Sequence, residues 1–205
     1  GVDAVAHPDE LLFEVLIGGA SNACMDGQNF FDTDHTWGTS GTQSNKLTAT
    51  IASANNPTEA EFRTAFHSAL LALQTFKRSN GKPWMRPTIK PLDTSKLLLM
   101  IHPNVQEVAN KALKKALVSG GETNIVLSDA TILANPYLTS AMTFYLLYTG
   151  AVIKPFIFQA RTPLKTQVVG RDSIEDKGVK FYAEARYNVG YGDWRNAVQV
   201  TMATA

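Results

Sequence analysis

Residues 24–35 read CMDGQNFFDTDH, and the interpretation of the chain starts from this segment. The pair Asp26-Gly27 lies between short apolar stretches, and both residue types tolerate the positive φ that a tight turn requires. We therefore predict a hairpin over residues 22–34, with its second half carrying the Phe30-Phe31 pair. The polar residues that follow Phe31 mark the start of a loop.

Helical patterns lie on both sides of this hairpin. Residues 8–18 are predicted as a short amphipathic helix, because Pro8 suits the first helical position. Residues 56–78 combine capping residues with a stripe of apolar side chains at helical spacing. A third helix is predicted to open at Pro103, with lysines opposite its apolar face.

Strands account for most of the remaining pattern. Apolar or alternating runs predict strands at 97–101, 125–127, 131–133, 143–148 and 155–158, and a long strand within 178–200 that turns at residues 193–195 into a final strand. Residues 36–56 are polar and are predicted to form a long surface loop. Few helices and many strands, without regular alternation, predict an α+β fold.

Composition excludes several classes of protein. Of the 205 residues 44% are hydrophobic and 18% charged, which allows a buried core. The 19 basic residues nearly cancel the 18 acidic ones, which disfavours sequence-specific nucleic-acid binding. The single cysteine, Cys24, excludes an internal disulfide framework. No apolar run approaches the roughly 20 residues of a membrane span.

The first residue is Gly1, and the sequence shows no initiator methionine. We interpret Gly1 as a processed end, a cloning scar or a cut inside a longer protein.

Asp32, Asp34 and His35 are the strongest candidates for chemistry. Two carboxylates and an imidazole within four residues are ligand types that manganese, zinc or iron accept. In a strand, however, Asp32 and Asp34 would share one face and His35 the other. We therefore favour a polar loop start whose side chains accept backbone donors, and keep a metal-dependent hydrolase as the alternative from another class.

No other pattern predicts an enzyme. Cys24 is expected to be a small buried side chain of the hairpin, and the sequence contains no Gly-x-Ser-x-Gly motif or phosphate-binding loop. We predict no catalytic residue, no metal and no cofactor.

Tryptophans and the lysines of the third helix are candidates for contacts between subunits, because aromatic residues are enriched in interfaces. For the tryptophans the alternative is a place in the core, and for the lysines a solvated helix face. The candidates are Trp37, Trp84, Lys111, Lys114, Lys115 and Trp194.

Three blocks in order carry a family resemblance: residues 24–35, the KPFIFQ block at 154–159 and the AEARYNVGYGD block at 183–193. From about Pro8 onward the chain resembles the major head subunits of bacteriophage Mu and its prophage relatives. The resemblance implies the Hong Kong ninety-seven type of capsid fold. It also implies a peripheral domain of residues 1–101 with 160–205, which contains the end of a long spine helix, and an axial domain of residues 102–159.

The resemblance further implies a structural subunit that self-assembles, as hexamers and pentamers, into the icosahedral head shell of a tailed phage or prophage. The expected partners are other copies of the chain, scaffold and portal proteins, and packaged DNA held without sequence specificity, with no membrane. The expected locations are the virion capsid and, during assembly, the host cytoplasm. A nanocompartment shell of the same fold is the alternative within this class.

Overall fold

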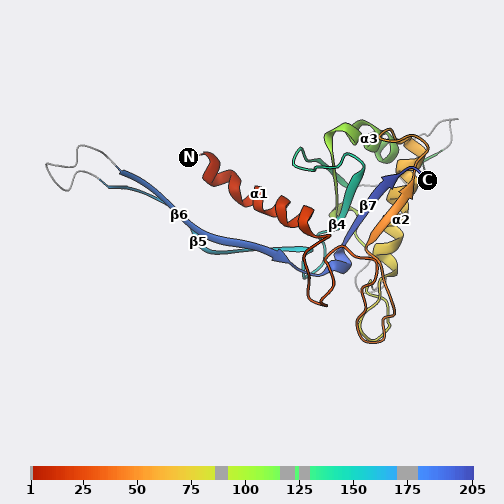
Figure 1. Cartoon of the computed structure of the whole chain (residues 1–205), viewed down its shortest axis with the longest axis horizontal. Coiled ribbons are helices and arrows are strands. Elements are labelled where there is room, and N and C mark those ends of the chain that lie inside the picture. The colour runs from red at the N-terminus through yellow and green to blue at the C-terminus, as the bar shows by residue number, and fades with distance from the viewer. Residues whose placement is uncertain (1, 86–91, 116–122, 125–129, 170–179) are drawn as a thin grey trace.

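The computed structural model describes residues 2–85, 92–115, 123–124, 130–169 and 180–205. The chain forms a body, built around one sheet, and an arm that extends from the body (Figure 1). Within the described residues, no helix has the length and apolar character needed to cross a bilayer.

The body is organised around a five-stranded mixed sheet of order β1-β7-β4-β2-β3. Its two outer pairs are parallel and its two inner pairs are antiparallel. Every residue of the central strand β4 is buried, which explains its uninterrupted apolar and aromatic sequence. The strands are β1 (Lys46–Thr50), β2 (Leu97–Ile101), β3 (Thr131–Ala134), β4 (Thr143–Tyr148) and β7 (Ala197–Ala203).

Two helices complete the body. Helix α2 (Glu59–Thr75) packs its apolar stripe on the sheet, where the rings of Phe62 and Phe144 lie 5.2 Å apart. It begins with a capping box: the Thr58 hydroxyl accepts from the backbone of Glu61, whose carboxylate accepts from the backbone of Thr58. Helix α3 (Gln106–Lys114) lies against α2. Single 3₁₀ turns, η1 (Thr94–Lys96), η2 (Pro103–Val105) and η3 (Trp194–Asn196), precede β2, α3 and β7.

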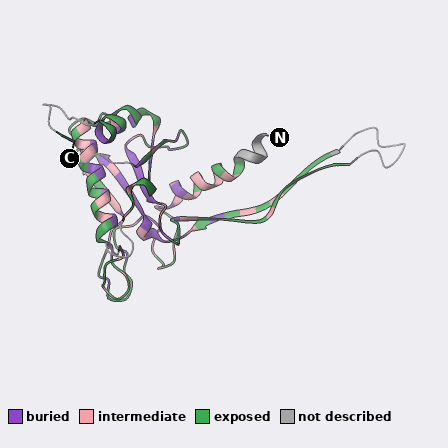
Figure 2. Cartoon of the chain, turned by 180° about the vertical axis from the view of Figure 1, so that it is seen from behind, coloured by how far each residue is buried: buried purple, intermediate pink, exposed green. Residues whose placement is uncertain are grey.

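The arm consists of helix α1 (Val2–Gly18) and a ribbon of two antiparallel strands, β5 (Phe156–Val169) and β6 (Lys180–Tyr191). Helix α1 lies along β6: the His7 and Tyr187 rings are 5.8 Å apart, and the Tyr191 hydroxyl donates to the Val15 carbonyl at 2.8 Å. Buried residues concentrate in the body, whereas most of the ribbon is exposed (Figure 2).

The structure corrects three of the predicted elements. Helix α1 begins at Val2, so Pro8 lies inside the helix, where its missing N–H removes one backbone hydrogen bond. Residues 36–56 are not a continuous loop, since β1 lies within them; its partner β7 is about 150 residues away, and its short polar sequence gives little apolar signal. Strand β5 extends to Val169 instead of ending at residue 158.

Other predicted elements match the structure. Strands β2 and β4 have the predicted limits, and α2 lies within the predicted range of 56–78. The predicted strand 125–127 lies outside the described residues.

The sheet joins segments that the predicted domain boundaries separate. Strands β3 and β4 lie within residues 102–159, whereas β1, β2 and β7 lie outside that range. The visible division of the fold therefore runs between the arm and the body (Figure 1). Pro155 directly precedes β5 and Gly192 directly follows β6, and a backbone hydrogen bond joins the two residues.

Gly192 offers a test of this connection. A Cβ at Gly192 would overlap the carbonyl oxygen of Lys154, while the Gly192 N–H donates to the Pro155 carbonyl at 2.7 Å. We expect Gly192→Ala to lower the free energy of unfolding by about 2 kcal/mol or more, because backbone atoms would have to move. Gly190→Ala is the matched control, since a Cβ there meets no atom within 4 Å. Equal denaturation midpoints for the two variants would contradict the tight connection.

Candidate functional site

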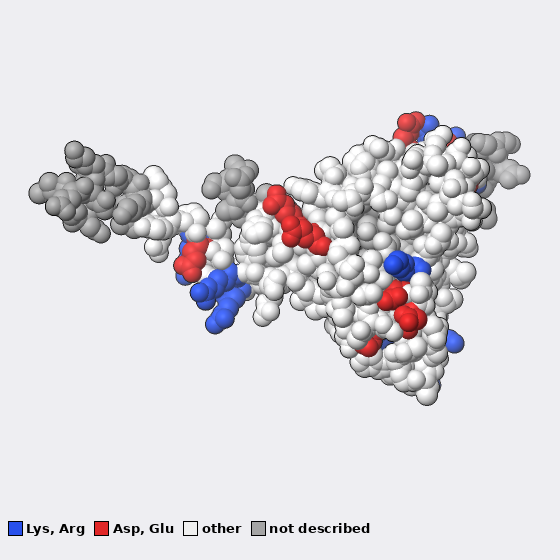
Figure 3. Space-filling model, in the orientation of Figure 1, with Lys and Arg blue, Asp and Glu red and all other residues white. Residues whose placement is uncertain are grey.

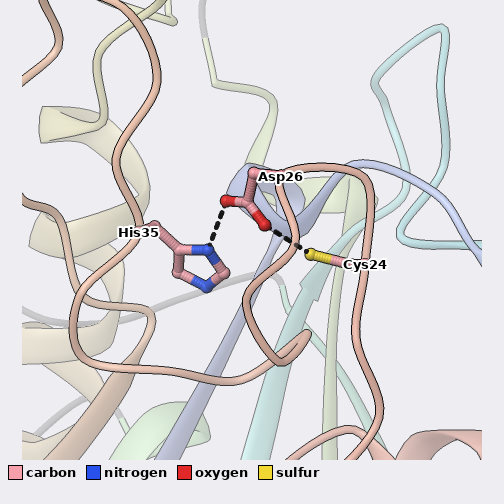
Figure 4. A group of neighbouring side chains, drawn as sticks. All are labelled: Cys24, Asp26 and His35. Carbon is pink, nitrogen blue, oxygen red and sulfur yellow. Dashed lines mark hydrogen bonds and ion pairs between the residues drawn. The ribbon is translucent and has the colours of Figure 1, made fainter.

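The segment at residues 24–35 contains the predicted hairpin turn, but only a few backbone contacts join its two sides. Gly27 turns the chain with a φ of +86°, and the Cys24 N–H donates to the Gln28 carbonyl at 2.7 Å. A single antiparallel bridge joins Ala23 to Asn29, so the two sides are not full strands. The turn directs the side chains of Cys24 and Asp26 toward the interior, where His35 lies (Figure 4).

Cys24, Asp26 and His35 form a linear chain of hydrogen bonds (Figure 4). The Cys24 thiol donates to Asp26 Oδ1 at 3.1 Å, and Asp26 Oδ2 lies 2.7 Å from His35 Nδ1. The side chains of His35 and Asp26 are 0% and 1% exposed. Such complete burial of an ion pair requires that the remaining polar atoms also find partners.

Asn45 supplies the partner on the far side of His35. Its amide nitrogen donates to the carbonyls of Phe30 at 2.7 Å and Trp194 at 3.3 Å. Its oxygen therefore accepts from the Asp32 N–H at 2.9 Å and faces His35 Nε2 at 3.1 Å. Both ring nitrogens of His35 face acceptor oxygens, an arrangement that a doubly protonated ring satisfies, and Nδ1 pairs with the Asp26 carboxylate.

Trp194 covers the face of the His35 ring. The two rings are stacked 3.9 Å apart with an interplanar angle of 7°, and Phe76 packs edge-on against the indole at 5.2 Å. Asp193 and Arg195 stabilise the turn η3 that contains Trp194, because the Arg195 guanidinium donates to both carboxylate oxygens of Asp193, at 2.8 and 2.9 Å. The cluster therefore joins the hairpin, the segment before β1, the end of α2 and the turn before β7.

The network shifts the pKa of two of its members. Burial tends to raise the pKa of Asp26, but hydrogen bonds from the Cys24 thiol and the His35 ring, together with the charge of that ring, hold it below its ordinary value. Burial, reinforced by the hydrogen bond to Asp26, raises the pKa of the Cys24 thiol to about 12. The stable state is thus a protonated thiol beside an ionised carboxylate.

This geometry does not favour nucleophilic catalysis. The carboxylate lies between the thiol and the imidazole, so His35 does not contact the Cys24 sulfur as an activating base would. The high pKa of Cys24 also keeps the thiolate scarce.

Cys24, Asp26 and His35 are also the one group of potential metal ligands within the described residues. Their ligand atoms lie within 4.8 Å of one another and are types that zinc accepts. A metal would have to displace the thiol proton and the Nδ1 proton, both of which bond to the same carboxylate. We therefore assign the cluster a structural role.

The structure does not bring Asp32, Asp34 and His35 together as a metal site. Asp32 Oδ1 accepts from the Thr33 N–H at 2.8 Å, as predicted for a polar loop start, and its backbone binds Asn45. Asp34 is exposed, whereas His35 points inward to Asp26. The sequence analysis did not identify Asp26 and Asn45 as partners of His35. The apolar Phe30-Phe31 pair, which is buried in the structure, was the sequence signal that this segment reaches the interior.

The predicted interface residues fall into different environments. Trp194 is 1% exposed and packs within its own chain, as the core alternative for the tryptophans expects. Trp84 is half-buried: its Nε1 donates to Asn196 Oδ1 at 3.2 Å, and the guanidinium of Arg195 lies 4.0 Å from the ring centroid. Trp37 is 43% exposed.

Trp37 belongs to the loop of residues 36–44, which is hydrogen-bonded to the loop of residues 77–83. These loops form a protrusion from the body (Figure 1). The two loops are joined where the Thr39 N–H donates to the Ser79 carbonyl at 2.8 Å and where Gln43 bonds to the backbone of Lys77. The three predicted lysines lie elsewhere, exposed on α3 or just after it; they are Lys111, which pairs with Glu107 at 2.5 Å, Lys114 and Lys115.

Asp26→Asn tests the buried ion pair. Because the variant leaves His35 without its counter-ion, we expect the free energy of unfolding to fall by about 3–5 kcal/mol. The pKa of Asp26 is lower in the folded chain, so its stabilisation is fully present above the ordinary aspartate pKa of about 4 and is lost as the pH falls below that value, through the lower folded-state pKa. Urea unfolding from pH 7 to pH 3 measures both effects.

The exposed Asp34→Asn is the control and should match the wild-type chain within about 0.5 kcal/mol. Parallel pH curves for wild type and Asp26→Asn would refute the role given to the Asp26 carboxylate.

Cys24 should react slowly with iodoacetamide in the folded chain. With its pKa raised from 9.0 to about 12, the thiolate population at pH 8 is about 1,000-fold smaller than in an unfolded chain. Mass spectrometry of native and urea-unfolded samples measures both rates. The structure places Cys24 at the surface of the cluster, partly buried rather than fully buried as predicted. Equal rates would show that the thiol is not held as a donor to Asp26.

Comparison with known proteins points to one family. The family described as Mu-like prophage major head subunit gpT matches residues 1–62, 51–138 and 139–204. The major capsid protein of Escherichia phage Mu is 25% identical over 206 residues, which cover 98% of this chain and 41% of that protein. The chain thus spans about two fifths of the length of this relative.

Two solved structures resemble the whole fold. The capsid structure of the cyanophage P-SCSP1u has a TM-score of 0.55 and 11% identity, covering 98% of this chain and 63% of that chain. The mature capsid of bacteriophage PhiM1 has a TM-score of 0.53 and 11% identity, covering 96% and 60%. This similarity confirms the predicted α+β phage capsid fold. Because the family match extends from residue 1 to residue 204, the chain belongs to the Mu-like prophage major head subunit family.

Proposed function

We propose that the chain is part of the major capsid protein of a Mu-like tailed phage or prophage, and that copies of it assemble into the icosahedral shell around the DNA. The family match along almost all of the chain carries this proposal. The capsid fold supports it, as does the absence of a nucleophile–base pair in the buried cluster. The site thus favours a structural subunit over a metal-dependent hydrolase.

We propose that the arm is the peripheral region of the subunit and the body its axial region. In the Hong Kong ninety-seven fold a long spine helix lies against the peripheral domain, and α1 lies along the ribbon in this way. The body would then face the centre of each hexamer or pentamer. This division replaces the boundaries at residues 101 and 159, which pass through the sheet.

The partners proposed for the subunit are further copies of itself, scaffold and portal proteins, and DNA held without sequence specificity. A formal net charge of +1 is consistent with a shell subunit that does not bind DNA tightly. Assembly in the host cytoplasm would precede its place in the virion capsid. Trp37, the half-buried Trp84 and the exposed lysines Lys111, Lys114 and Lys115 remain proposed contact residues.

Electron microscopy and sedimentation velocity test this function. The samples are the chain and any longer polypeptide of which it is a part. We expect closed shells or flat sheets of hexamers, since a subunit with heterologous contacts forms rings or open lattices. Nucleic acid recovered from shells made in cells would support a phage head, whereas an enclosed enzyme would support a nanocompartment. Monomers in every sample would contradict a shell function.

A further inference from the structure

The ribbon has an apolar surface at its far end that α1 does not reach. Val168 and Phe181 are opposite each other in the register, and Phe181 is 77% exposed. Phe181 shares a strand face with Tyr187, whose ring contacts His7 of α1, because successive residues of β6 alternate between faces. From Tyr187 to Phe181 the strand advances about 20 Å, whereas α1 continues for only about 7.5 Å beyond His7.

Uncharged side chains form this far-end surface. The next pair on the same face is Thr166 with Ala183, and both are exposed. In the view of Figure 3 this part of the ribbon is uncharged, and the acidic and basic side chains of the arm lie closer to the body. We call Thr166, Val168, Phe181 and Ala183 the far-end patch. Phenylalanine is enriched at the centre of protein interfaces, so the patch has the composition of a contact surface.

A second uncovered apolar surface lies where the chain passes from the body into the ribbon. Residues 149–155 connect β4 to β5, and they present Val152 and Ile153 to solvent. Val152 is 90% exposed, which leaves almost its whole side chain in contact with water. We call these two residues the base patch.

Hydrogen bonds hold the loop of the base patch in place. The N–H and the hydroxyl of Thr149 donate to the Lys96 carbonyl at 2.9 and 2.8 Å, and the Asn196 amide donates to the Ile153 carbonyl at 3.1 Å. Ala151, between these two anchored residues, is buried in the core. Because the loop is already ordered, binding through the base patch costs little conformational entropy.

The two patches cannot meet within one chain. Val168 lies 12 residues beyond Phe156, the first residue of β5, which at about 3.3 Å per residue places the far-end patch roughly 40 Å from the loop. Both views of the fold show the ribbon extending away from the body (Figure 1, Figure 2). Contact between a far-end patch and a base patch therefore requires two copies of the chain.

We propose that the far-end patch of one copy packs on the base patch of a second copy of this chain. This inference rests on the proposed shell function and deepens it, because it names surfaces that join neighbouring subunits. One such contact removes both kinds of patch from water, whereas a symmetric contact between two far-end patches would leave Val152 and Ile153 exposed in both copies. Each copy has one patch of each kind, so the contact repeats head to tail, as a ring or lattice requires.

Cysteine crosslinking tests the contact. Val152→Cys and a mass-tagged Phe181→Cys are each made in a Cys24→Ser background, in which the serine hydroxyl can still donate to Asp26. Mixed and oxidised with copper–phenanthroline, they should form a mixed disulfide dimer at least tenfold faster than either variant forms a dimer with itself. The tag separates the dimers on a denaturing gel, and a thermal melt confirms that each variant is folded.

Gln167→Cys is the matched control for Phe181→Cys. Gln167 is exposed at nearly the same distance along the ribbon, but it is next to Val168 and therefore lies on the opposite face. Its mixed dimers with Val152→Cys should form at least tenfold more slowly than those of Phe181→Cys. Equal rates would refute the contact, and so would a faster dimer of Phe181→Cys with itself.

Electron microscopy of the wild-type chain, and of any longer polypeptide of which it is a part, separates the two kinds of failure. Shells or sheets without an excess of mixed disulfides would refute this contact and leave the proposed function intact. Monomers in every wild-type sample would contradict the proposed function instead. A mixed disulfide that forms in the chain but not in the longer polypeptide would show that another part of the same subunit covers a patch, which also refutes the contact.

Discussion

The buried ion pair between Asp26 and His35 is the interaction on which the rest of the body depends. Both side chains lie in the interior, where Asp26 also accepts from the Cys24 thiol and His35 also faces Asn45, which is 10 residues further along the chain. Asn45 faces the imidazole ring while holding the carbonyls of Phe30 and Trp194. Residues distant in sequence must therefore all be in place before any of these charges is accommodated. The network of this pair thereby joins the hairpin, the loop before β1 and the turn before β7.

Local signals predicted the parts of the fold that local physics controls. The turn at Asp26-Gly27, the capped start of α2 and the apolar runs of β2 and β4 all follow from neighbouring residues. Strand β1 was missed because its pairing with β7, a segment far along the chain, makes it a strand. The sequence predicted only part of the site. His35 was identified as a candidate, but its partners Asp26 and Asn45 are 9 and 10 residues away and come close only when the loop is folded. The proposed function came from the resemblance of three ordered sequence blocks to a known family. The periodicity of apolar residues alone did not indicate it.

The body and the arm differ in how they are stabilised. The body buries a continuous core, with aromatic rings from the hairpin, α2 and β4 in contact. The ribbon has side chains on both faces, and no second sheet packs against it. Most of its described residues are therefore exposed to solvent. A ribbon of this kind holds its shape through backbone pairing and through α1, which contacts one face and leaves the opposite face exposed.

The ribbon is connected to the body at Pro155 and Gly192, so a rotation at this junction would be amplified along the length of the ribbon. Strand β5 has 14 residues, which at about 3.3 Å per residue gives a length of roughly 46 Å from the junction. A rotation of about 10° at the base would thus displace the far end by roughly 8 Å, more than the width of a single strand. The close fit of Gly192 against Lys154 limits that rotation. A small change of backbone conformation at this base would therefore have its largest effect at the far end of the ribbon.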